Sequence, residues 1–445
     1  YRSYLMPNLY SDAPDPEDRT KASFIGFDSK MHSAHGFNYY SDLSLWDTFR
    51  TVHPLYVLID QKSQSDMIQS LLSMAETGGT LPRWPSGAGY SSSMLGHPAA
   101  IMISESYLKG IRNFDARKAL KFMVKSTSPK STVVDRFGND VDEYGKEFVD
   151  EYIKFGYCPS DTEESVSRTL EYSYADYSIY RLARELGESK IIDEYYQRSQ
   201  NYKNLWNDQL KLFAPKKSDG HFIDSVSLTD TSYIRNTETG KAFVEGGANQ
   251  WRWYLPQEPE LLASMYGDQF IPQLNTFFEN AKEEIGQMYP GVNYWHGNEP
   301  DLHASYLFNF GGRPDLTQKW VRWIIDHKYK ASAQGLDGDD DAGTLSAWYV
   351  FSSLGFYPLA GTEKYVLGAP VVSNATVELD FIKGTKKLEI KVKNFSPSNI
   401  YVESVRMNGK LLNQPYITHA ELALGGVLEF TMSAIPVNTF EGGAE

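Results

Sequence analysis

The stretch Glu163–Gly187, EESVSRTLEYSYADYSIYRLARELG, predicts a long helix and decides the fold class. Its apolar side chains recur along one stripe at helical spacing: Val166, Leu170, Tyr174 and Tyr177. Leu182 and Leu186 extend the apolar content, and Gly187 is a residue that commonly ends a helix. We therefore predict a helix over residues 163–186.

The same helical periodicity continues on both sides of this stretch, from about residue 40 to residue 358. Residues 63–76 predict a helix that Gly78 stops, and residues 317–328 predict another. Long segments rich in Gly, Pro, Trp and Asp, such as 79–98 and 286–303, separate the helices. Long ordered loops usually carry function, so this pattern favours a helical toroid with a loop-lined pocket.

The pattern changes after Pro358, where segments 376–382, 386–393 and 427–432 read as strands and Asn408-Gly409 as a hairpin turn. We predict an antiparallel module of five to seven strands over residues 359–445, following a helical domain over residues 1–358. A module this thin does not make an independent sandwich. It should pack either on the helical domain or on a partner outside this chain.

Composition excludes several functions. The net charge of −14 opposes binding to nucleic acid or to an anionic membrane surface. No apolar run approaches the length of a membrane span. Cys158 is the single cysteine, so no intrachain disulfide forms. The aromatic share of 14% suits either a large packed core or a cleft whose rings stack on sugars.

Two motifs near the N-terminus could contact a sugar. In Ser44-Leu-Trp-Asp-Thr-Phe-Arg50, the side chains of Trp46, Asp47 and Arg50 lie within one helical turn. An Asp and an Arg can clamp a sugar diol while the Trp stacks on the ring. The alternative is a helix start with an i,i+3 ion pair. In Leu81-Pro-Arg-Trp84, a rigid loop presents Arg83 and Trp84, and the alternative there is a structural turn.

Glu245 opens the segment EGGANQWRW, which suits a general acid. Burial of this carboxyl among Trp251 and Trp253 would raise its pKa toward the working pH.

Two acidic segments suggest a hard cation. The segment WHGNEPDLH, residues 295–303, offers Asn298, Glu299 and Asp301, whose oxygens favour calcium over zinc. The segment GLDGDDDAGTLSAW carries four aspartates in five positions: Asp337, Asp339, Asp340 and Asp341. Like charges this close are costly unless a cation or a proton compensates them. The alternative is a solvated acidic loop.

Taken together, these motifs resemble glycoside hydrolase family 92, the calcium-dependent exo-α-mannosidases. The resemblance lies in their order: YRSYLMPNLYSD, SLWDTFRTVHPL, LPRW, VSRTLEYSYADY, EG-x-x-x-Q-x-x-W-x-x-P, GNEPDLH and GDDDAGTLSAWYVFSSLGFYP. It covers roughly residues 1–370. The activity it implies is exo-acting, inverting hydrolysis of terminal α-linked mannose in N-glycans or mannans.

The resemblance also implies an architecture. The family joins an N-terminal β-sandwich to an (α/α)6 barrel, and its last strands return to the sandwich. This chain would then be mainly α: an (α/α)6 barrel catalytic domain with a C-terminal antiparallel β module from a β-sandwich that is mostly absent. We expect that sandwich segment as a partner, on the same precursor or on a separate chain, and no activity without it. A secreted, periplasmic or cell-surface location fits such an enzyme.

Roles carry over residue by residue from the resemblance. Glu245 matches the general acid, while Asp339 and Asp341 match the aspartates assigned to the general base. Glu299 matches a sugar-contacting glutamate near a calcium ion that bridges two mannose hydroxyls. Glu299, Asp301 and Asp341 are the expected ligands of that Ca²⁺ ion. The expected substrate contacts are Trp46, Asp47, Arg50, Arg83, Trp84, Asn298 and Glu299.

Several positions depart from the family pattern, and they bear on linkage preference. They are Gly247, Asn249, Gln257-Glu258, Ala342 and Thr344. Asn298 stands where members that prefer α-1,2 bonds carry a His, which disfavours that linkage. Two alternatives remain: a catalytically inactive, calcium-dependent mannan-binding protein, and a different (α/α)6 enzyme such as a glucan hydrolase or a polysaccharide lyase.

Overall fold

The computed structural model describes residues 1–11, 21–91, 93–129, 146–232, 237–284 and 291–440. The fold is mostly helical. The chain divides into two compact units. Unit 1 comprises Tyr1–Leu205, Lys216–Phe222 and Asp341–Thr344, and unit 2 comprises Trp206–Pro215, Ile223–Asp340 and Leu345–Glu445.

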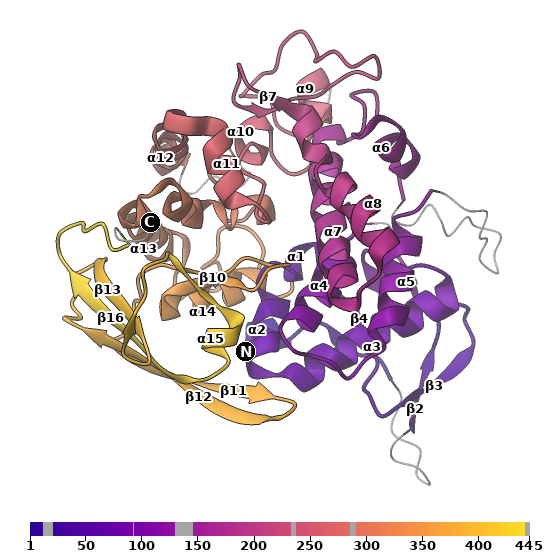
Figure 1. The fold of residues 1–445 in the computed structure, drawn as a ribbon, viewed down its shortest axis with the longest axis horizontal. Helices are drawn as coiled ribbons and strands as arrows, with labels where there is room; N and C mark the ends of the chain where they lie inside the picture. The colour runs from indigo at the N-terminus through magenta and orange to yellow at the C-terminus, as the bar shows by residue number, and fades with distance from the viewer. Residues whose placement is uncertain (12–20, 92, 130–145, 233–236, 285–290, 441–445) are drawn as a thin grey trace. The chain divides into compact units, whose positions relative to one another are not determined.

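Unit 1 is built around one long helix, α7 (Ser165–Leu186), which packs against α4, α5 and α8 (Figure 1). The helices of unit 1 are α1 (Leu45–Thr48), α2 (Val52–Ile59), α3 (Gln61–Gly78), α4 (Pro98–Leu108), α5 (Ala116–Ser126), α6 (Val149–Phe155), α7 and α8 (Ser189–Ser199). The helix predicted over 163–186 is confirmed, and Gly187 ends it in the left-handed conformation at φ 73°. Helix α3 runs past the predicted stop, because Gly79 at φ 104° is its cap.

Helix α7 is buried on nearly all sides over its first four turns, which a single apolar stripe did not predict. The buried positions include the charged residues Arg168, Glu171 and Asp176. Asp176 accepts hydrogen bonds from Tyr152 Oη at 2.9 Å and from Arg198 Nε at 3.0 Å. A buried charge is costly without such partners, so the centre of unit 1 is a paired polar network and not an apolar core alone.

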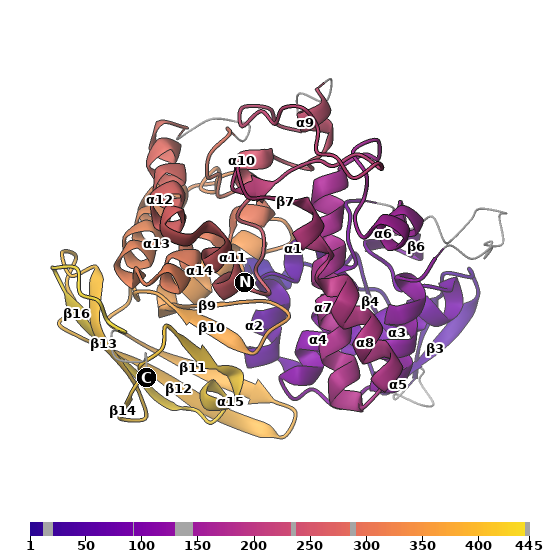
Figure 2. The ribbon, with the colours of Figure 1, turned by 45° about the horizontal axis from the view of Figure 1, so that its top comes forward.

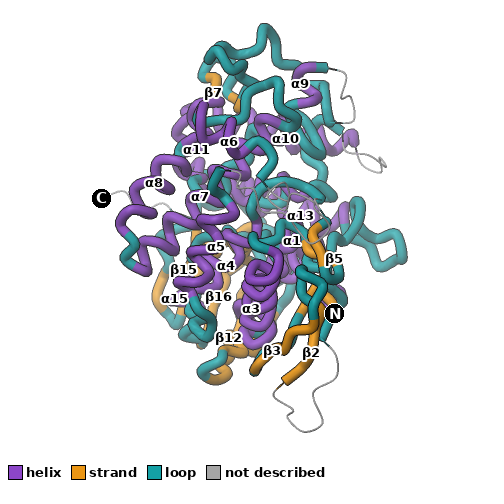
Figure 3. The backbone as a smooth tube through the Cα atoms, turned by 90° about the vertical axis from the view of Figure 1, so that its right-hand side faces the viewer, coloured by secondary structure: helices purple, strands orange, loops and turns teal. Residues whose placement is uncertain are grey.

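The strands of unit 1 that the structure describes form three short antiparallel pairs. They are β1 (Asn8–Leu9) with β4 (Tyr40–Ser41), β5 (Pro85–Ser86) with β6 (Gly89–Tyr90), and β2 (Lys21–Ile25) with β3 (Met31–His35), the pair that Figure 3 shows. A 3₁₀ turn, η1 (Arg2–Tyr4), opens the chain, and η3 (Asn201–Leu205) follows α8.

Unit 2 gathers its rings into an aromatic core. Trp253 stacks on Tyr266 with ring centroids 5.0 Å apart, and Phe278 stacks on Trp320 at 5.2 Å. Its helices are α9 (Glu238–Lys241), α10 (Ala248–Trp251), α11 (Pro259–Tyr266), α12 (Phe270–Ala281), α13 (Pro314–Lys328) and α14 (Thr344–Leu354), with 3₁₀ turns η4 (Gly267–Gln269), η5 (Lys282–Glu284), η6 (Glu299–Asp301) and η7 (Ala304–Gly311). Much of the aromatic surplus of the sequence therefore fills this core.

Two sheets complete unit 2, besides the short pair β7 (Trp206–Asn207) and β8 (Leu212–Phe213). The three-stranded sheet has the order β15 (Tyr416–Thr418), β10 (Lys364–Leu367), β9 (Phe356–Pro358). The five-stranded sheet has the order β11 (Asn374–Phe381), β12 (Gly384–Lys393), β16 (Gly426–Ser433), β13 (Tyr401–Met407), β14 (Lys410–Leu411). The three predicted strands are confirmed as β11, β12 and β16.

The prediction of an all-antiparallel module is wrong for one pair, because β16 runs parallel to β12. Alternation of apolar and polar residues identifies a strand but not its direction. Parallel neighbours need a long connection, which segment 394–425 provides here. That segment contains β13, β14, β15 and the short helix α15 (His419–Leu422).

One face of the five-stranded sheet is apolar and covered within unit 2. Its buried side chains include Ile390, Leu428 and Phe430. Val402 N of β13 donates to Gln318 Oε1 of α13 at 3.0 Å, and Figure 2 shows β13 and β16 beside α13. The opposite face is charged. Of the two packing alternatives left by the sequence, packing on the helices of the same unit is therefore confirmed for this face.

Candidate active site

Glu245 lies on a strained turn between α9 and α10. Its φ is 41°, and that of the following Gly246 is 137°. Ser232 holds this turn twice: its N–H donates to Gly246 O at 2.6 Å, and its Oγ accepts from Gly246 N at 3.1 Å. A non-glycine residue in the left-handed region costs about 1–3 kcal/mol and persists only where its surroundings impose it. The half-buried Glu245 carboxylate is therefore presented from a fixed backbone.

Packing explains why two glycines follow Glu245. A Cβ atom on Gly247 would lie 2.2 Å from the backbone oxygen of Asp230. Gly247 also starts α10, where its N–H donates to Gln250 Oε1 at 3.1 Å. Trp251 contributes to the same turn, because its Nε1 donates to Val244 O at 2.7 Å. Its neighbour Trp253 instead belongs to the aromatic core of unit 2.

Asn298 connects the Glu245 turn to the acidic loop that follows α12. Its Nδ2 donates to the backbone oxygen of Glu245. Its Oδ1 is buried and has no hydrogen-bond partner among the residues that the structure describes. Glu299 and Asp301 follow in η6 and are also buried, at 2% and 0% exposure. Residues 286–290 of the predicted loop lie outside the described residues.

Groups of unit 2 offset part of the negative charge of the aspartate segment. Asp337 pairs with the buried Lys328 at 2.8 Å. Asp340 accepts from the N–H and Oγ of Ser346 at 2.9 and 2.8 Å, in the first turn of α14. A cation and a helix start thus offset two of the four carboxylates. Asp339 lies between them and is exposed. The alternative of a solvated acidic loop therefore describes this one residue and not the whole segment.

The acidic loop and the aspartate segment touch through their backbones. A Cβ atom built on Gly297 would lie 1.9 Å from the backbone oxygen of Asp337. Together with the Asn298 bond to Glu245, this contact makes one continuous cluster of the Glu245 turn, the acidic loop and the aspartate segment. Unit 2 therefore brings together the segments that carry Glu245, Asn298, Glu299, Asp301 and Asp339.

We expect Gly297→Ala to destabilise this cluster strongly, because the clash involves backbone on both sides and no rotamer can relieve it. The expected loss of unfolding free energy is about 3 kcal/mol or more. Urea denaturation of the purified variant measures it. Gly89→Ala is the control, since a Cβ there meets nothing within 4 Å. Equal stability of the two variants would contradict the close contact.

A buried histidine stands directly before Gly297. His296 Nδ1 lies 2.7 Å from Tyr294 Oη, and its Nε2 lies 2.6 Å from Tyr329 Oη. Burial lowers the pKa of His296 well below its usual value, and the positive charge of Lys328 lowers it further. The imidazole is therefore neutral around pH 7.

Asp341 lies in unit 1, at the end of the aspartate run. It begins three successive left-handed residues, with φ 45° at Asp341, 53° at Ala342 and 92° at Gly343. Ser3 Oγ donates to Gly343 O at 3.0 Å, and Thr51 Oγ1 donates to Thr344 O at 2.8 Å. These bonds fix the turn that carries Asp341.

Trp46, Asp47 and Arg50 are all buried in unit 1. Arg50 Nε donates to Trp46 O at 3.1 Å, and Arg50 forms an ion pair with Glu171 of α7 at 3.3 Å. The alternative drawn from the sequence was a local pair between Asp47 and Arg50. Sequence reasoning missed Glu171 because it is 121 positions away.

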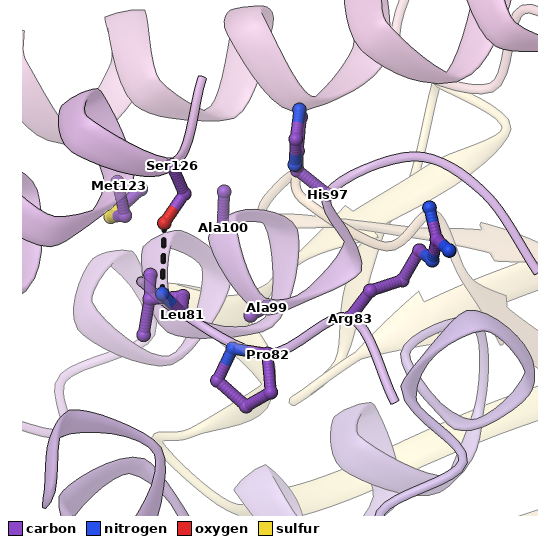
Figure 4. A pocket seen from close by; sticks show the side chains of 8 residues that line it. All are labelled: Leu81, Pro82, Arg83, His97, Ala99, Ala100, Met123 and Ser126. Carbon is purple, nitrogen blue, oxygen red and sulfur yellow. Dashed lines mark hydrogen bonds between the residues drawn. The ribbon is translucent and has the colours of Figure 1, made fainter. Parts of the chain in front are cut away.

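Arg83 anchors its loop, and Trp84 follows it as the more exposed residue. The Arg83 guanidinium holds both carboxylate oxygens of Glu147, at 2.7 and 3.1 Å, and its Nε donates to Ser93 O. Beside it lies a cavity of about 10 Å³, room for one water molecule, which His97 also lines (Figure 4). Ser126 Oγ accepts from Leu81 N in its wall.

The carboxylates of the acidic loop bear on the expected calcium site. Glu299 and Asp301 offer buried carboxylate oxygens, which is the ligand type calcium prefers. Among the described residues, no group of three or more His, Cys, Asp and Glu side chains gathers closely enough to hold a metal ion. The residues thus fit calcium in chemical type, and further oxygens from water or substrate would be needed to complete its shell.

Comparison with known proteins identifies the class as a glycosyl hydrolase. Residues 1–434 match the family described as the glycosyl hydrolase family 92 catalytic domain, and the chain belongs to this family. Within the described residues, none of the helices combines the length and hydrophobicity that a membrane span requires.

Solved structures of the same family are similar over nearly the whole chain. One is a family 92 α-mannosidase from Bacteroides thetaiotaomicron in complex with mannoimidazole, with TM-score 0.87, 29% identity, and coverage of 98% of this chain and 56% of that one. Another is a family 92 inverting mannosidase from the same organism, with TM-score 0.87, 30% identity, and coverage of 98% and 58%.

A curated relative is an uncharacterized secreted glycosidase of Arthroderma benhamiae. It is 24% identical over an alignment of 396 positions, which covers 82% of this chain and 49% of the relative. The chain therefore spans about half the length of the proteins it matches.

Proposed function

We propose that this protein is an exo-acting, inverting α-mannosidase that removes terminal α-linked mannose from N-glycans or mannans with the help of calcium. The observation that carries the proposal is the left-handed Glu245 turn, whose backbone oxygen accepts a hydrogen bond from Asn298 of the acidic loop. Support comes from structural neighbours named as mannosidases, one of them as inverting.

Glu245 is the proposed general acid, which gives its proton to the leaving oxygen as the glycosidic bond breaks. The proposed general base takes a proton from the water that attacks the anomeric carbon on the opposite face. Asp339 is exposed and so accessible to such a water, and Asp341 is the second candidate. One displacement with two separate carboxylates inverts the anomeric configuration.

The proposed sugar contacts differ in what they offer. The buried Oδ1 of Asn298 can accept a bond from a sugar hydroxyl, and Glu299 lies beside it. Trp84 is more exposed than the buried Trp46 and is suited to stacking on a pyranose. Trp46, Asp47, Arg50 and Arg83 remain predicted contacts.

Calcium remains part of the proposal: Glu299 and Asp301 are the residues that would offer it carboxylate oxygens, and Asp341 remains a predicted ligand. When bound, the ion would supply a positive charge that can orient the hydroxyls of the substrate. The protein side chains do the proton transfers.

The finer architecture is also a proposal. We propose residues 1–358 as an (α/α)6 catalytic domain and residues 359–445 as the C-terminal strand module. A β-sandwich segment, in the same polypeptide or as a separate chain, is the proposed partner. A secreted, periplasmic or cell-surface location gives access to mannose-containing glycans.

Removal of calcium should abolish turnover. We expect release of β-mannose from one or more of the α-1,2-, 1,3-, 1,4- and 1,6-linked mannobioses, followed by proton NMR to identify the first anomer formed. EDTA should stop the release, and added Ca²⁺ should restore it. The α-1,2 compound is the expected poorest substrate. Initial release of α-mannose would refute inversion, and full activity in EDTA would refute the role of calcium.

A further inference from the structure

Three ring residues of unit 2 form a continuous hydrogen-bonded chain beside Asn298. Tyr294 Oη contacts His296 Nδ1 at 2.7 Å, and His296 Nε2 contacts Tyr329 Oη at 2.6 Å. Tyr329 Oη then contacts the backbone oxygen of Leu345 at 2.8 Å. Tyr294 and His296 are buried, and Trp348 lies edge-on to the imidazole at 4.4 Å between centroids.

The bonding pattern fixes every proton in this chain. The Leu345 carbonyl can only accept, so Tyr329 donates its single proton to it. Tyr329 must then accept from His296, which places the imidazole proton on Nε2. Nδ1 carries the lone pair and accepts from Tyr294. His296 is therefore one defined neutral tautomer, with both ring nitrogens committed to protein partners.

This hydrogen-bonded chain of rings joins the acidic loop to the start of α14, and the proposed reaction uses residues on both sides. On one side, His296 is followed by Gly297 and Asn298, and Asn298 holds the backbone of Glu245. On the other side, Leu345 stands in the first turn of α14, next to Ser346, which binds Asp340.

The acidic loop and the aspartate segment do not depend equally on this hydrogen-bonded chain of rings. The aspartate segment has anchors of its own, in the pairs Asp337–Lys328 and Asp340–Ser346. The acidic loop has an internal bond from Trp295 N to Asp301 Oδ2 at 3.2 Å, and its end is held to α14 by Trp348 Nε1, which donates to Leu302 O at 3.0 Å. His296 links the start of the loop, just before Asn298, to α14. Loss of the chain should therefore displace the Asn298 side, and with it Glu245, more than the aspartates.

We propose that His296, Tyr294 and Tyr329 are positioning residues that set the place of the acid Glu245 relative to the aspartate segment. The proposal rests on the proposed function, because it takes Glu245 as the general acid. Since the chain acts on the acid, its loss should slow only those reactions whose leaving group needs a proton.

Tyr329→Phe in the full protein tests this, because it removes one oxygen and keeps the ring stacked near Trp348. Two substrates are compared: an α-mannobiose, whose sugar leaving group needs protonation, and 2,4-dinitrophenyl α-mannoside, whose leaving group does not. We expect kcat for the mannobiose to fall by about 10²-fold, the effect of a misplaced catalytic group. For the dinitrophenyl compound we expect a change below about threefold.

Matched variants separate positioning from general damage. Tyr306→Phe removes another buried hydroxyl bond, that to Ser352 at 2.8 Å, and should leave both rates unchanged. His296→Gln keeps a donor for Tyr329 and should retain more mannobiose activity than His296→Phe. If Tyr329→Phe does not fold, Tyr294→Phe serves in its place. Equal loss on both substrates, or no loss on either, would overturn the proposal.

The same comparison of substrates on Glu245→Gln distinguishes an error in the assignment of the acid from an error in the positioning proposal alone. If Glu245→Gln lacks the leaving-group dependence, the assignment of Glu245 as the acid fails, and the positioning proposal, which depends on it, fails with it. If Glu245→Gln shows the dependence while Tyr329→Phe does not, only the positioning proposal fails.

Discussion

Glu245→Gln is expected to lower kcat on α-mannobioses by about 10²- to 10⁴-fold, the usual contribution of a general acid. The amide keeps the size of the side chain and its place on the left-handed turn but has no acidic proton to give. Binding should survive, because Asn298 donates to the backbone oxygen of Glu245, which the substitution keeps. Steady-state kinetics and calorimetric titration with mannobiose measure the two effects separately.

Glu260→Gln is the control for this variant. Glu260 is an exposed glutamate of unit 2 that pairs with Lys364 at the surface, and its substitution should leave kcat unchanged. Full activity of Glu245→Gln would make Glu299 the candidate acid. A wild-type protein that binds mannobiose in the presence of calcium without any turnover would instead support the mannan-binding alternative.

Asp339→Asn is expected to cause a loss of similar size, about 10²- to 10⁴-fold, with a different substrate pattern. The base acts on the attacking water, so its loss should slow mannobiose and dinitrophenyl mannoside alike. Sodium azide should restore turnover of the dinitrophenyl compound, because azide attacks without giving up a proton. The expected product is β-mannosyl azide, detected by NMR, with dinitrophenolate as the leaving group.

Asp341→Asn decides which aspartate is the base. Asparagine tolerates the left-handed conformation as well as aspartate does, so the φ of 45° is preserved. If Asp339 is the base, azide rescues Asp339→Asn and not Asp341→Asn, whose defect should respond to calcium concentration instead. Rescue of Asp341→Asn alone would exchange the two roles.

Periodicity predicted the regular elements well. The sequence prediction for α13 began three residues late, at 317 instead of 314, because Pro314 at the first helical position was not taken as a start signal. The strands β11, β12 and β16 lie within two residues of their predicted bounds. The direction of β16 could not be predicted, since alternation is the same for parallel and antiparallel pairing.

The candidate site was predictable as motifs but not as contacts. Glycine pairs and clustered carboxylates pointed to Glu245, Glu299 and Asp339. The partner of Arg83, Glu147, lies 64 positions away, and no local spacing indicates it. Nor did the sequence indicate that His296 bonds to two tyrosines, because Tyr329 is 33 positions further on.

The place of β16 has a consequence for the order of assembly. Among the residues that the structure describes, this strand comes last in the sequence, yet it pairs with both β12 and β13 and so lies in the middle of its sheet. On the ribosome, β11 with β12 and β13 with β14 can form as separate hairpins, but nothing joins them until residues 426–433 have emerged. The sheet therefore closes only after all of residues 374–433 have been synthesised, and a nascent chain stopped shortly before β16 exposes two unpaired strand edges to aggregation.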